Sequence, residues 1–394
     1  MRRVVFYVLL TLSAIRSFSQ DSVWWGRTTG QLPFIEYGIG DDRLGGAKMG
    51  FLDSNVLVKI IDSFKTDYKV SLSEQHMGYI AKTSVILMNK EANYPVHHNT
   101  HLSGSIRVFG DTASDFVVVN VNERLPYRSI QMIDPSRVAV DLFGVTSNTN
   151  WITQLRTAKE IRNTWYEQIE NDVFRVYIQL RHTQHWGHSI AYDSAGRHLI
   201  IRIRRQPPVL DIRKLRIAID AGHGGDNSGA DGLTSKVLEK EYTLKIAKEL
   251  QKTLKAAGVK NIFMTRTIDT TLSMPERIAM LKTFDPHLLV SIHLNSAGND
   301  TVSGTSTYYR YIGFRPLTVS ILDRMLTLGL KEYGNVGNFN FSLSGPTDYP
   351  NALVEVAFLS NPADEKKILN PKFHKAVARK IYLGIVDWLK QMKR

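Results

Sequence analysis

The C-terminal half of the chain alternates between two kinds of apolar pattern. Short, nearly continuous apolar runs, which are typical of buried strands, occur at 215–220, 261–266, 287–294, 304–312 and 352–359. Between and after them, apolar residues recur with the period of an α-helix at 238–258, 273–284, 316–334 and 373–391. Strands that alternate with helices favour an α/β domain over residues 214–394, with a mostly parallel sheet and flanking helices.

The N-terminal half alternates between apolar and polar residues with the period of a strand. Closely spaced short runs predict a small β-barrel at residues 40–90, and longer alternating runs predict a β-sandwich at 100–206. The segment 151–172 does not fit this pattern clearly. Two consecutive prolines cannot lie inside a helix or a central strand, so residues 207–213 are expected to be a linker. The fold class is therefore multidomain, with β-rich modules before the α/β domain.

The start of the chain has the pattern of a secretory signal peptide. Two arginines precede an apolar run of about a dozen residues, from Val4 to Ile15, and small residues follow at Ser17 and Ser19. This run is short for a transmembrane helix, and an uncleaved membrane anchor is the alternative. No later segment is apolar for long enough to cross a bilayer. We therefore expect that residues 1–20 are removed and that the mature protein has no transmembrane anchor.

The composition indicates which classes of partner the protein can bind and excludes some kinds of metal site. The 394 residues include 50 Lys and Arg against 37 Asp and Glu, and the formal net charge of +13 favours anionic polymers or membrane surfaces. Because the basic residues form no compact run with interleaved aromatics, nucleic acid is not an expected partner. The chain has no cysteine, which excludes disulfides, iron–sulfur clusters and thiolate zinc sites.

Polar residues at the ends of the predicted strands form a candidate zinc site. His223 follows the first strand, and His293 lies near the end of the strand at 287–294. Glu239 is at the start of the first helix, which begins at the same edge of the sheet. Two imidazoles and one carboxylate, with a fourth position open, are a ligand pattern of catalytic zinc. Each residue alone has a structural interpretation, since a first-turn glutamate is favoured by the helix dipole, so the prediction depends on the combination.

Glu355 is the candidate general base. It lies in the apolar run 352–359, where burial would raise the pKa of a carboxyl group towards a range useful for proton transfer. Asp220 is expected to orient His223 from behind, and Asn295 to contact the substrate. Two other histidine clusters are not expected to bind metal, because strand-like patterns place such spacings on alternate faces: His97, His98 and His101, and His182, His185 and His188.

Four motifs in residues 214–394 resemble, in order, those of the zinc-dependent N-acetylmuramoyl-L-alanine amidase family. They are IAIDAGHGG, LEKEYTLKIA, SIHLNSAG and LVEVAFLSNP. The resemblance implies that His223, Glu239 and His293 bind Zn²⁺ and that Glu355 is the catalytic glutamate. It also implies the reaction, which is cleavage by zinc-activated water of the amide bond between N-acetylmuramic acid and L-alanine in peptidoglycan.

The N-terminal half carries two looser resemblances. Residues 40–90 resemble the bacterial Src-homology-type small barrels of cell-wall enzymes, and residues 100–206 resemble the AMIN domain, a β-sandwich of envelope proteins. The AMIN resemblance implies targeting to peptidoglycan or to envelope machinery and favours the periplasm as the location. An envelope or cell-division protein is a candidate activator.

Departures from the family pattern keep alternatives open. AGHGG lacks the proline that more often precedes the glycine, and VEVAF lacks the usual glycine before the phenylalanine. The stretch between His293 and Glu355 leaves no room for the inhibitory helix of some members, so control would come from the N-terminal modules or a partner. The alternatives are another zinc hydrolase, such as a peptidase or a polysaccharide deacetylase, and a non-catalytic or activator-dependent peptidoglycan-binding adaptor.

Overall fold

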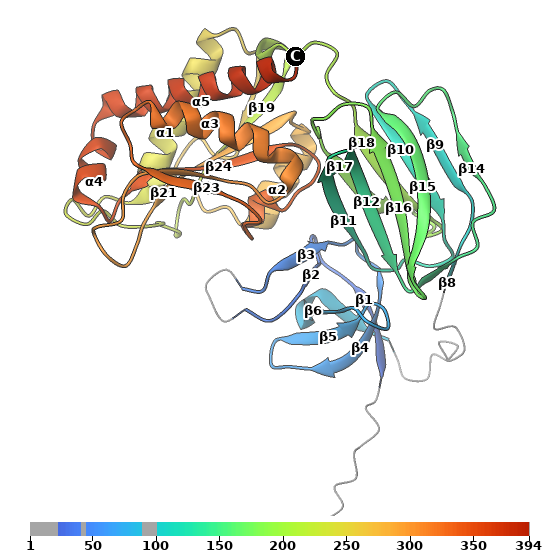
Figure 1. Ribbon diagram of the computed structural model, residues 1–394. Helices are drawn as coiled ribbons and strands as arrows, with labels where there is room; N and C mark the ends of the chain where they lie inside the picture. The colour runs from blue at the N-terminus through green and yellow to red at the C-terminus, as the bar shows by residue number, and fades with distance from the viewer. Residues whose placement is uncertain (1–22, 41–44, 89–100, 394) are drawn as a thin grey trace, which may run out of the picture.

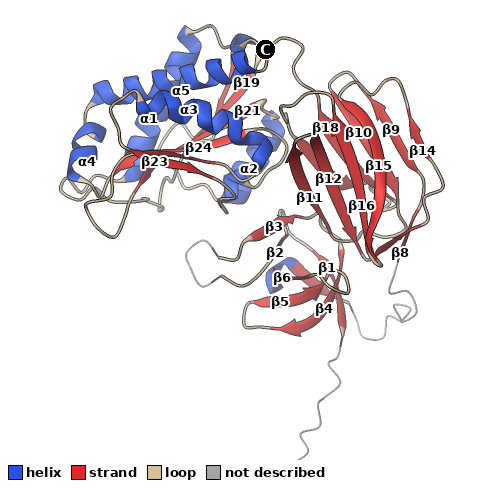
Figure 2. Ribbon diagram, viewed as in Figure 1, coloured by secondary structure: helices blue, strands red, loops and turns tan. Residues whose placement is uncertain are grey.

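The computed structural model describes residues 23–40, 45–88 and 101–393, which form three units (Figure 1). The first two units are built from strands, and the third contains the α-helices (Figure 2). The predicted signal peptide lies outside the described residues. None of the described helices is long and apolar enough to cross a membrane.

The first unit is an antiparallel sheet with the strand order β3-β2-β6-β5-β4-β1-β7. Its strands are β1 (Trp24–Thr28), β2 (Phe34–Glu36), β3 (Lys48–Phe51), β4 (Leu57–Ser63), β5 (Asp67–Ser71), β6 (Met77–Ala81) and β7 (Val85–Leu87). Both β1 and β2 lie before residue 40, where we expected the barrel to begin. These strands have only five and three residues, so their alternation is too brief to be recognised in the sequence.

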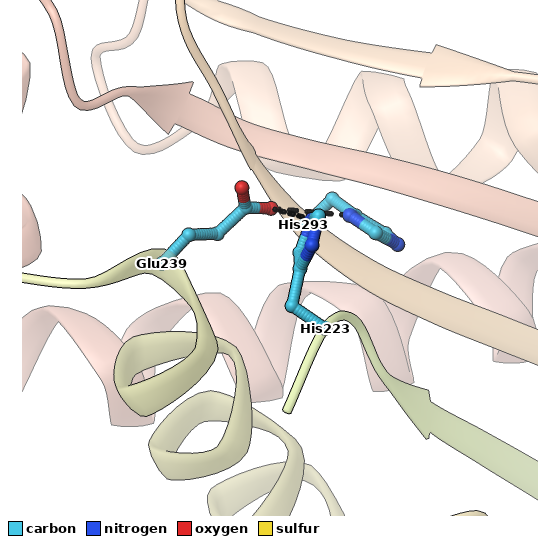
Figure 3. A group of neighbouring side chains, drawn as sticks. All are labelled: His223, Glu239 and His293. Atoms are coloured by element: carbon cyan, nitrogen blue, oxygen red, sulfur yellow. Dashed lines mark hydrogen bonds and ion pairs between the residues drawn. The ribbon is translucent and has the colours of Figure 1, made fainter. Parts of the chain in front are cut away.

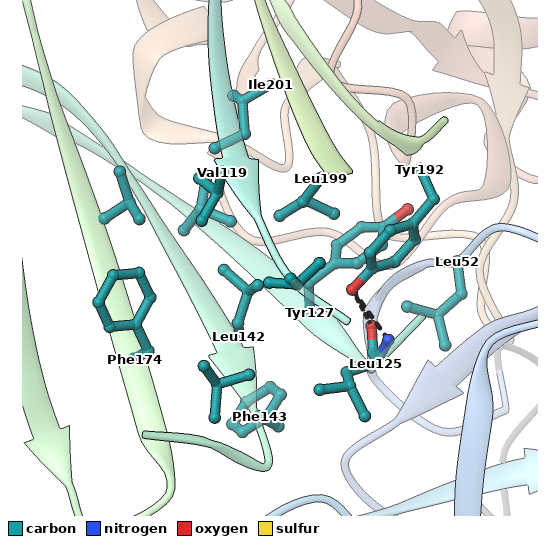
Figure 4. Packing of buried hydrophobic residues seen from close by; sticks show 14 of the residues in the cluster. Leu52, Val119, Leu125, Tyr127, Leu142, Phe143, Phe174, Tyr192, Leu199 and Ile201 are labelled. Carbon is teal, nitrogen blue, oxygen red and sulfur yellow. Dashed lines mark hydrogen bonds between the residues drawn. The ribbon is translucent and has the colours of Figure 1, made fainter. Parts of the chain in front are cut away.

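The second unit consists of two β-sheets that pack face to face, as the alternating pattern predicts (Figure 4). One sheet has the order β14 (Ile152–Gln154), β9 (Ile106–Gly110), β10 (Ser114–Asn120), β18 (His198–Arg204) and β17 (His188–Tyr192). The other has the order β11 (Tyr127–Ile133), β12 (Ser136–Phe143), β16 (Val173–Leu180) and β15 (Ile161–Glu170). Their strand pairs are antiparallel except for β14 with β9. A short pair, β8 (His101–Ser103) and β13 (Val145–Ser147), lies beside them. The segment 151–172, which the sequence left unassigned, supplies β14 and β15.

The third unit has a mixed sheet with the order β20-β19-β21-β24-β22-β23. The strands are β19 (Arg216–Ala221), β20 (Asn261–Met264), β21 (Leu288–Asn295), β22 (Thr305–Tyr308), β23 (Glu332–Val336) and β24 (Asn351–Phe358). β22 runs antiparallel to β24, and the other neighbouring pairs are parallel. The helices are α1 (Glu239–Ala256), α2 (Met274–Phe284), α3 (Arg315–Leu326), α4 (Pro362–Ile368) and α5 (Pro371–Gln391).

Alternate residues of β19 face different helices. Ile217 and Ile219 share a core with apolar residues of α1, α3 and α5, whereas Ala218 packs with Ile278 and Leu281 of α2. This period-two burial explains why β19 reads as a continuous apolar run. It leaves the carboxyl end of the strand free to carry polar side chains.

The helix expected at 316–334 is shorter than predicted. α3 ends at Leu326, and Gly329 has a φ of 70°, a left-handed conformation that stops a helix. The chain then forms β23, an edge strand that the sequence did not predict. Leucines on both sides of Gly329 continue the helical apolar pattern, which is why periodicity alone extended the helix too far.

The three units pack against one another. One hydrophobic core extends from the first unit into the second, and Figure 4 shows Leu52 beside Leu125 and Tyr192. Phe51 of β3 packs against a cluster of the third unit that includes Leu343. The third unit is therefore in contact with the first through the chain segment just before β24.

Candidate metal centre and active site

A tight turn after β19 presents His223. His223 has a φ of 61°, and Gly224 and Gly225 follow with φ values of 130° and 58°. Left-handed backbone is uncommon for a residue with a side chain and ordinary for glycine, so the turn depends on its glycines. The imidazole is half-buried, and its Nδ1 lies 2.8 Å from Oδ1 of Asn227.

Two buried arginines hold the backbone of this turn. Arg266 donates from Nε to the carbonyl of Ala221 and from Nη2 to that of Gly222, over 2.9 and 2.8 Å. Arg277 donates from Nη2 to the carbonyl of His223 over 2.6 Å. Consecutive carbonyl groups are thus fixed by charged donors, and the position of the His223 ring follows from them.

Glu239 and His293 lie beside His223 (Figure 3). Glu239 is the first residue of α1, and its Oε1 lies 3.1 Å from both Nε2 of His223 and Nδ1 of His293. Its Oε2 accepts a hydrogen bond of 2.9 Å from the amide of Ala230. The candidate ligand atoms of the three residues all lie within 4.8 Å of one another. The structure therefore brings together the three residues that the sequence proposed as metal ligands.

The charges of this cluster are coupled. Burial alone would raise the pKa of Glu239, but hydrogen bonds and attraction from the two histidines outweigh burial and hold it well below its usual range. Burial lowers the pKa of His223, yet the hydrogen bond and charge of Glu239 raise it overall. A carboxylate kept ionised between two imidazoles supplies the negative charge that a divalent cation needs.

The space around the cluster suits a metal ion. A Cβ added at Gly229 would lie 2.5 Å from Oε2 of Glu239 and 2.8 Å from Cδ2 of His223. A Cβ added at Gly222 would lie 2.5 Å from Nε2 of His293. Two nitrogen donors, one oxygen donor and glycines that leave room for them fit Zn²⁺. No other group of three such side chains comes this close within the described residues.

Glu355 lies next to His293 across two parallel strands. It is the register partner of His293 between β21 and β24, and of Ser306 on the antiparallel side. Its side chain is half-buried. Asn295, at the end of β21, donates from Nδ2 to the hydroxyl of Tyr308 over 3.3 Å. The candidate substrate contact therefore lies on the strand that carries His293, and the candidate base lies on the neighbouring strand β24.

Asp220 is placed differently from our expectation. Its buried carboxylate accepts hydrogen bonds from Arg277, Thr265 and Ser291 over 2.6, 2.7 and 2.7 Å. Burial disfavours its ionisation, but Arg277 holds its pKa below the usual value. Asp220 is thus connected to the backbone carbonyl of His223 through Arg277, while the ring itself is bonded to Asn227.

Asn227 was not predicted from the sequence, because its hydrogen bond to the ring of His223 depends on the geometry of the turn. The signal that could have found it is its position four residues after His223 in a glycine-rich segment. The histidines of the second unit have structural partners: Glu160 for His182, the carbonyl of Met132 for His185 and Ser129 for His188. His97 and His98 lie outside the described residues.

Comparisons with known proteins agree with the motif resemblance. Residues 217–387 match the model of the N-acetylmuramoyl-L-alanine amidase family. The chain is 34% identical over 176 residues to the probable cell wall amidase LytH of Staphylococcus epidermidis, which covers 44% of this chain and 57% of that protein. LytH of Staphylococcus aureus gives the same identity over 175 residues, with the same shares covered. The chain thus spans somewhat more than half the length of these curated relatives.

Solved structures of amidases match the same part of the chain. The catalytic domain of CwlV from Bacillus (Paenibacillus) polymyxa var. colistinus is 31% identical and covers 44% of this chain and 97% of its own, with a TM-score of 0.42. An N-acetylmuramoyl-L-alanine amidase from Clostridium difficile 630 is 32% identical over 45% of this chain and 98% of its own, also with a TM-score of 0.42. The similarity to N-acetylmuramoyl-L-alanine amidases thus lies in the C-terminal unit of this chain, where residues 217–387 match the family model.

Proposed function

We propose that this protein is a zinc-dependent hydrolase that cleaves the amide bond between N-acetylmuramic acid and L-alanine in peptidoglycan. The observation that carries the proposal is the convergence of His223, Glu239 and His293 within 4.8 Å, with Glu355 beside His293 in the sheet. The family match supports the amide bond as the target.

The residues divide the chemistry between them. His223, Glu239 and His293 would hold Zn²⁺, which when bound polarises a carbonyl group and makes water a stronger nucleophile. Glu355 would take the proton of the attacking water and deliver it to the amide nitrogen, so that the amine can leave. Asn227 would keep the ring of His223 in the tautomer with Nε2 free, because it bonds to Nδ1.

The two β-rich units would keep the enzyme at its polymeric substrate. The formal charge of +13 supports attraction to an anionic wall polymer. We place the mature protein in the periplasm after signal cleavage, with peptidoglycan as its substrate and an envelope or cell-division protein as a candidate activator. Asn295 would contact the substrate, because it lies at the end of the strand that carries His293.

The test is digestion of purified peptidoglycan by the full mature chain. We expect release of intact stem peptides, identified by mass, and loss of this release after treatment with a chelator and recovery with added zinc. Glu355→Gln should abolish release while zinc binding persists. The matched control is Glu332→Gln, because Glu332 is an exposed glutamate on the nearby strand β23 and should be dispensable.

Other products would point to the alternatives. Cleavage inside the stem peptide would indicate a peptidase, and release of acetate would indicate a deacetylase. Binding to peptidoglycan without any cleavage, both alone and with envelope extract, would refute the enzyme and leave the adaptor. Cleavage that appears only with envelope extract would indicate an activator.

A further inference from the structure

The loop before β24 places aromatic rings next to the metal cluster. The ring of Phe341 meets that of His293 edge to face, with centroids 5.1 Å apart and an interplanar angle of 84°. Phe339 stacks on Phe341 at 6.1 Å and packs on Tyr308 at 4.6 Å. Phe339 and Phe341 are half-buried residues. We call Tyr308, Phe339 and Phe341 the aromatic wall.

The residue between the two phenylalanines binds the first unit instead. Asn340 donates from Nδ2 to the carbonyl of Gly46 over 2.6 Å and accepts at Oδ1 from the amide of Lys48 over 3.2 Å. One side chain thus satisfies both a donor and an acceptor of the backbone around β3, a strand nearly 300 positions earlier in the sequence. The alternation Phe-Asn-Phe joins two of the three units.

Neighbouring contacts strengthen this junction. Arg310 donates from Nη2 to the carbonyl of Lys48. Phe51 lies so close to Gly345 that a Cβ there would be 2.7 Å from its Cε2. Tyr311 donates to the carbonyl of Gly345 over 2.9 Å, which ties the end of the loop to the strand side of the third unit. The loop is therefore held between β3 and the candidate active site.

We propose that the aromatic wall contacts the apolar groups of the substrate that flank the scissile amide, and that the first unit positions this wall through Asn340. The inference depends on the function proposed above. The groups concerned are methyl groups, on the lactyl side or on the first amino acid, because Phe341 adjoins a candidate ligand of the zinc that would hold the carbonyl. Phe341 is then a specificity-determining residue and Asn340 a positioning residue.

Because the aromatic wall lies beside the candidate metal ligands, it is expected to affect KM more than kcat. Contacts from rigid rings favour substrate binding equally before and during the reaction, which changes KM more than kcat. Backbone hydrogen bonds already hold part of the loop, since the amide of Phe339 donates to the carbonyl of Tyr309 over 3.1 Å and the amide of Ser344 to that of Phe341 over 3.0 Å. Contacts outside the third unit restrict the half-buried rings further. Asn340 contributes two such contacts through its hydrogen bonds to the backbone around β3.

The first experiment compares Asn340→Ala with Asn338→Gly in the full mature chain. Asn338 lies in the same loop, is exposed and has a φ of 54°, which glycine accepts, so its variant should behave as wild type. For Asn340→Ala we expect KM for soluble muramyl peptides to rise about tenfold, with kcat within about twofold of wild type. Unchanged constants would overturn the positioning role. So would a lower kcat at constant KM, because that indicates less folded enzyme.

The second experiment tests the wall with a matched pair of substrates. Their first amino acid is L-alanine or glycine, which differ by one methyl group. Wild type should prefer alanine by about fourfold in kcat/KM, which corresponds to the burial of one methyl group. Phe341→Ala should lose this preference and Phe341→Leu should keep part of it, at unchanged zinc affinity.

The outcomes separate the two proposals. If wild type cleaves neither substrate, the proposed function fails. If wild type cleaves both and Phe341→Ala keeps the same preference, the aromatic wall has no role in specificity and this inference alone is refuted.

Discussion

Adding one methyl group at Gly222 should weaken zinc binding with little effect on folding. Gly222 precedes His223, and its carbonyl is held by Arg266 and by the hydroxyl of Thr243, over 2.8 Å in each case. Its φ is not in the left-handed region, so alanine can adopt its backbone conformation. The effect of Gly222→Ala therefore comes from the new Cβ and not from strain in the main chain.

The size of the effect follows from the space available. The Cβ would lie 2.5 Å from Nε2 of His293 and 2.6 Å from its Nδ1, whereas ordinary contact begins at 3.4 Å. The imidazole must move by about 1 Å, since Gly222 is fixed by its hydrogen bonds. A displacement of about 1 Å in a catalytic group costs about a hundredfold in rate. We expect a loss of about tenfold to a hundredfold in zinc affinity and a larger loss in amidase activity.

Zinc affinity is measured by competition with a chelating dye, and stability by urea unfolding of the metal-free protein. The matched control is Gly298→Ala, because a Cβ at this exposed glycine would have no neighbour within 4 Å. Zinc affinity of Gly222→Ala equal to that of Gly298→Ala would refute the reasoning. A large loss of stability in the metal-free protein would also refute it, because the methyl group would then disturb the core.

Three further predictions concern the turn after β19 and a buried histidine of the second unit. Arg277→Lys should destabilise the protein by about 3–5 kcal/mol in urea unfolding, because lysine cannot reach all the partners of the fork and leaves buried Asp220 poorly paired; an unchanged midpoint would contradict this. Asn227→Ala should lower zinc affinity by about tenfold to a hundredfold in the dye assay by removing the partner of His223, and unchanged affinity would show that the turn alone orients the ring. Burial lowers the pKa of His185 to about 4, below its ordinary value of 6.5. Between these two pH values the imidazole is protonated in the unfolded chain and neutral in the folded chain, so the free energy of unfolding falls as the pH falls. His185 should therefore cost about 2 kcal/mol of stability between pH 7 and pH 5, which His185→Gln should remove in urea unfolding at the two pH values; equal losses in both proteins would refute its contribution.

The elements that the sequence predicted best are those whose signals are local. The helix predicted at 273–284 is one of them, and the hydroxyl of Ser273 forms a capping box with Glu276 at the start of α2. The convergence of His223, Glu239 and His293 could be predicted because parallel strand ends meet at one edge of the sheet, whichever side chains surround them. Glu355 remains a prediction for its role, although its place beside His293 follows from the register of β24.

What the sequence could not predict depends on contacts between distant segments. Asp220 was expected to orient His223, and the structure connects the two through Arg277, a residue that no local pattern around Asp220 indicates. Asn340 meets Gly46 only because the first unit lies against the third, and no local pattern contains that information. The same is true of β23, which forms a strand by pairing in parallel with β22, a segment about 25 residues earlier in the chain.

The pair formed by Arg277 and Asp220 shows what these long-range contacts serve. Both side chains are 1% exposed, and burying two charges costs more than packing two apolar side chains of similar size. The pair is therefore a poor device for stability alone. Its arginine also donates to the carbonyls of Ala221 and His223, which an apolar replacement could not do. His223, Glu239 and His293 are carried by different elements, so the ring of His223 must be held in place relative to the other two. By fixing the carbonyls of the turn, Arg277 orients this ring, and we infer that the buried pair serves the site more than the stability of the core.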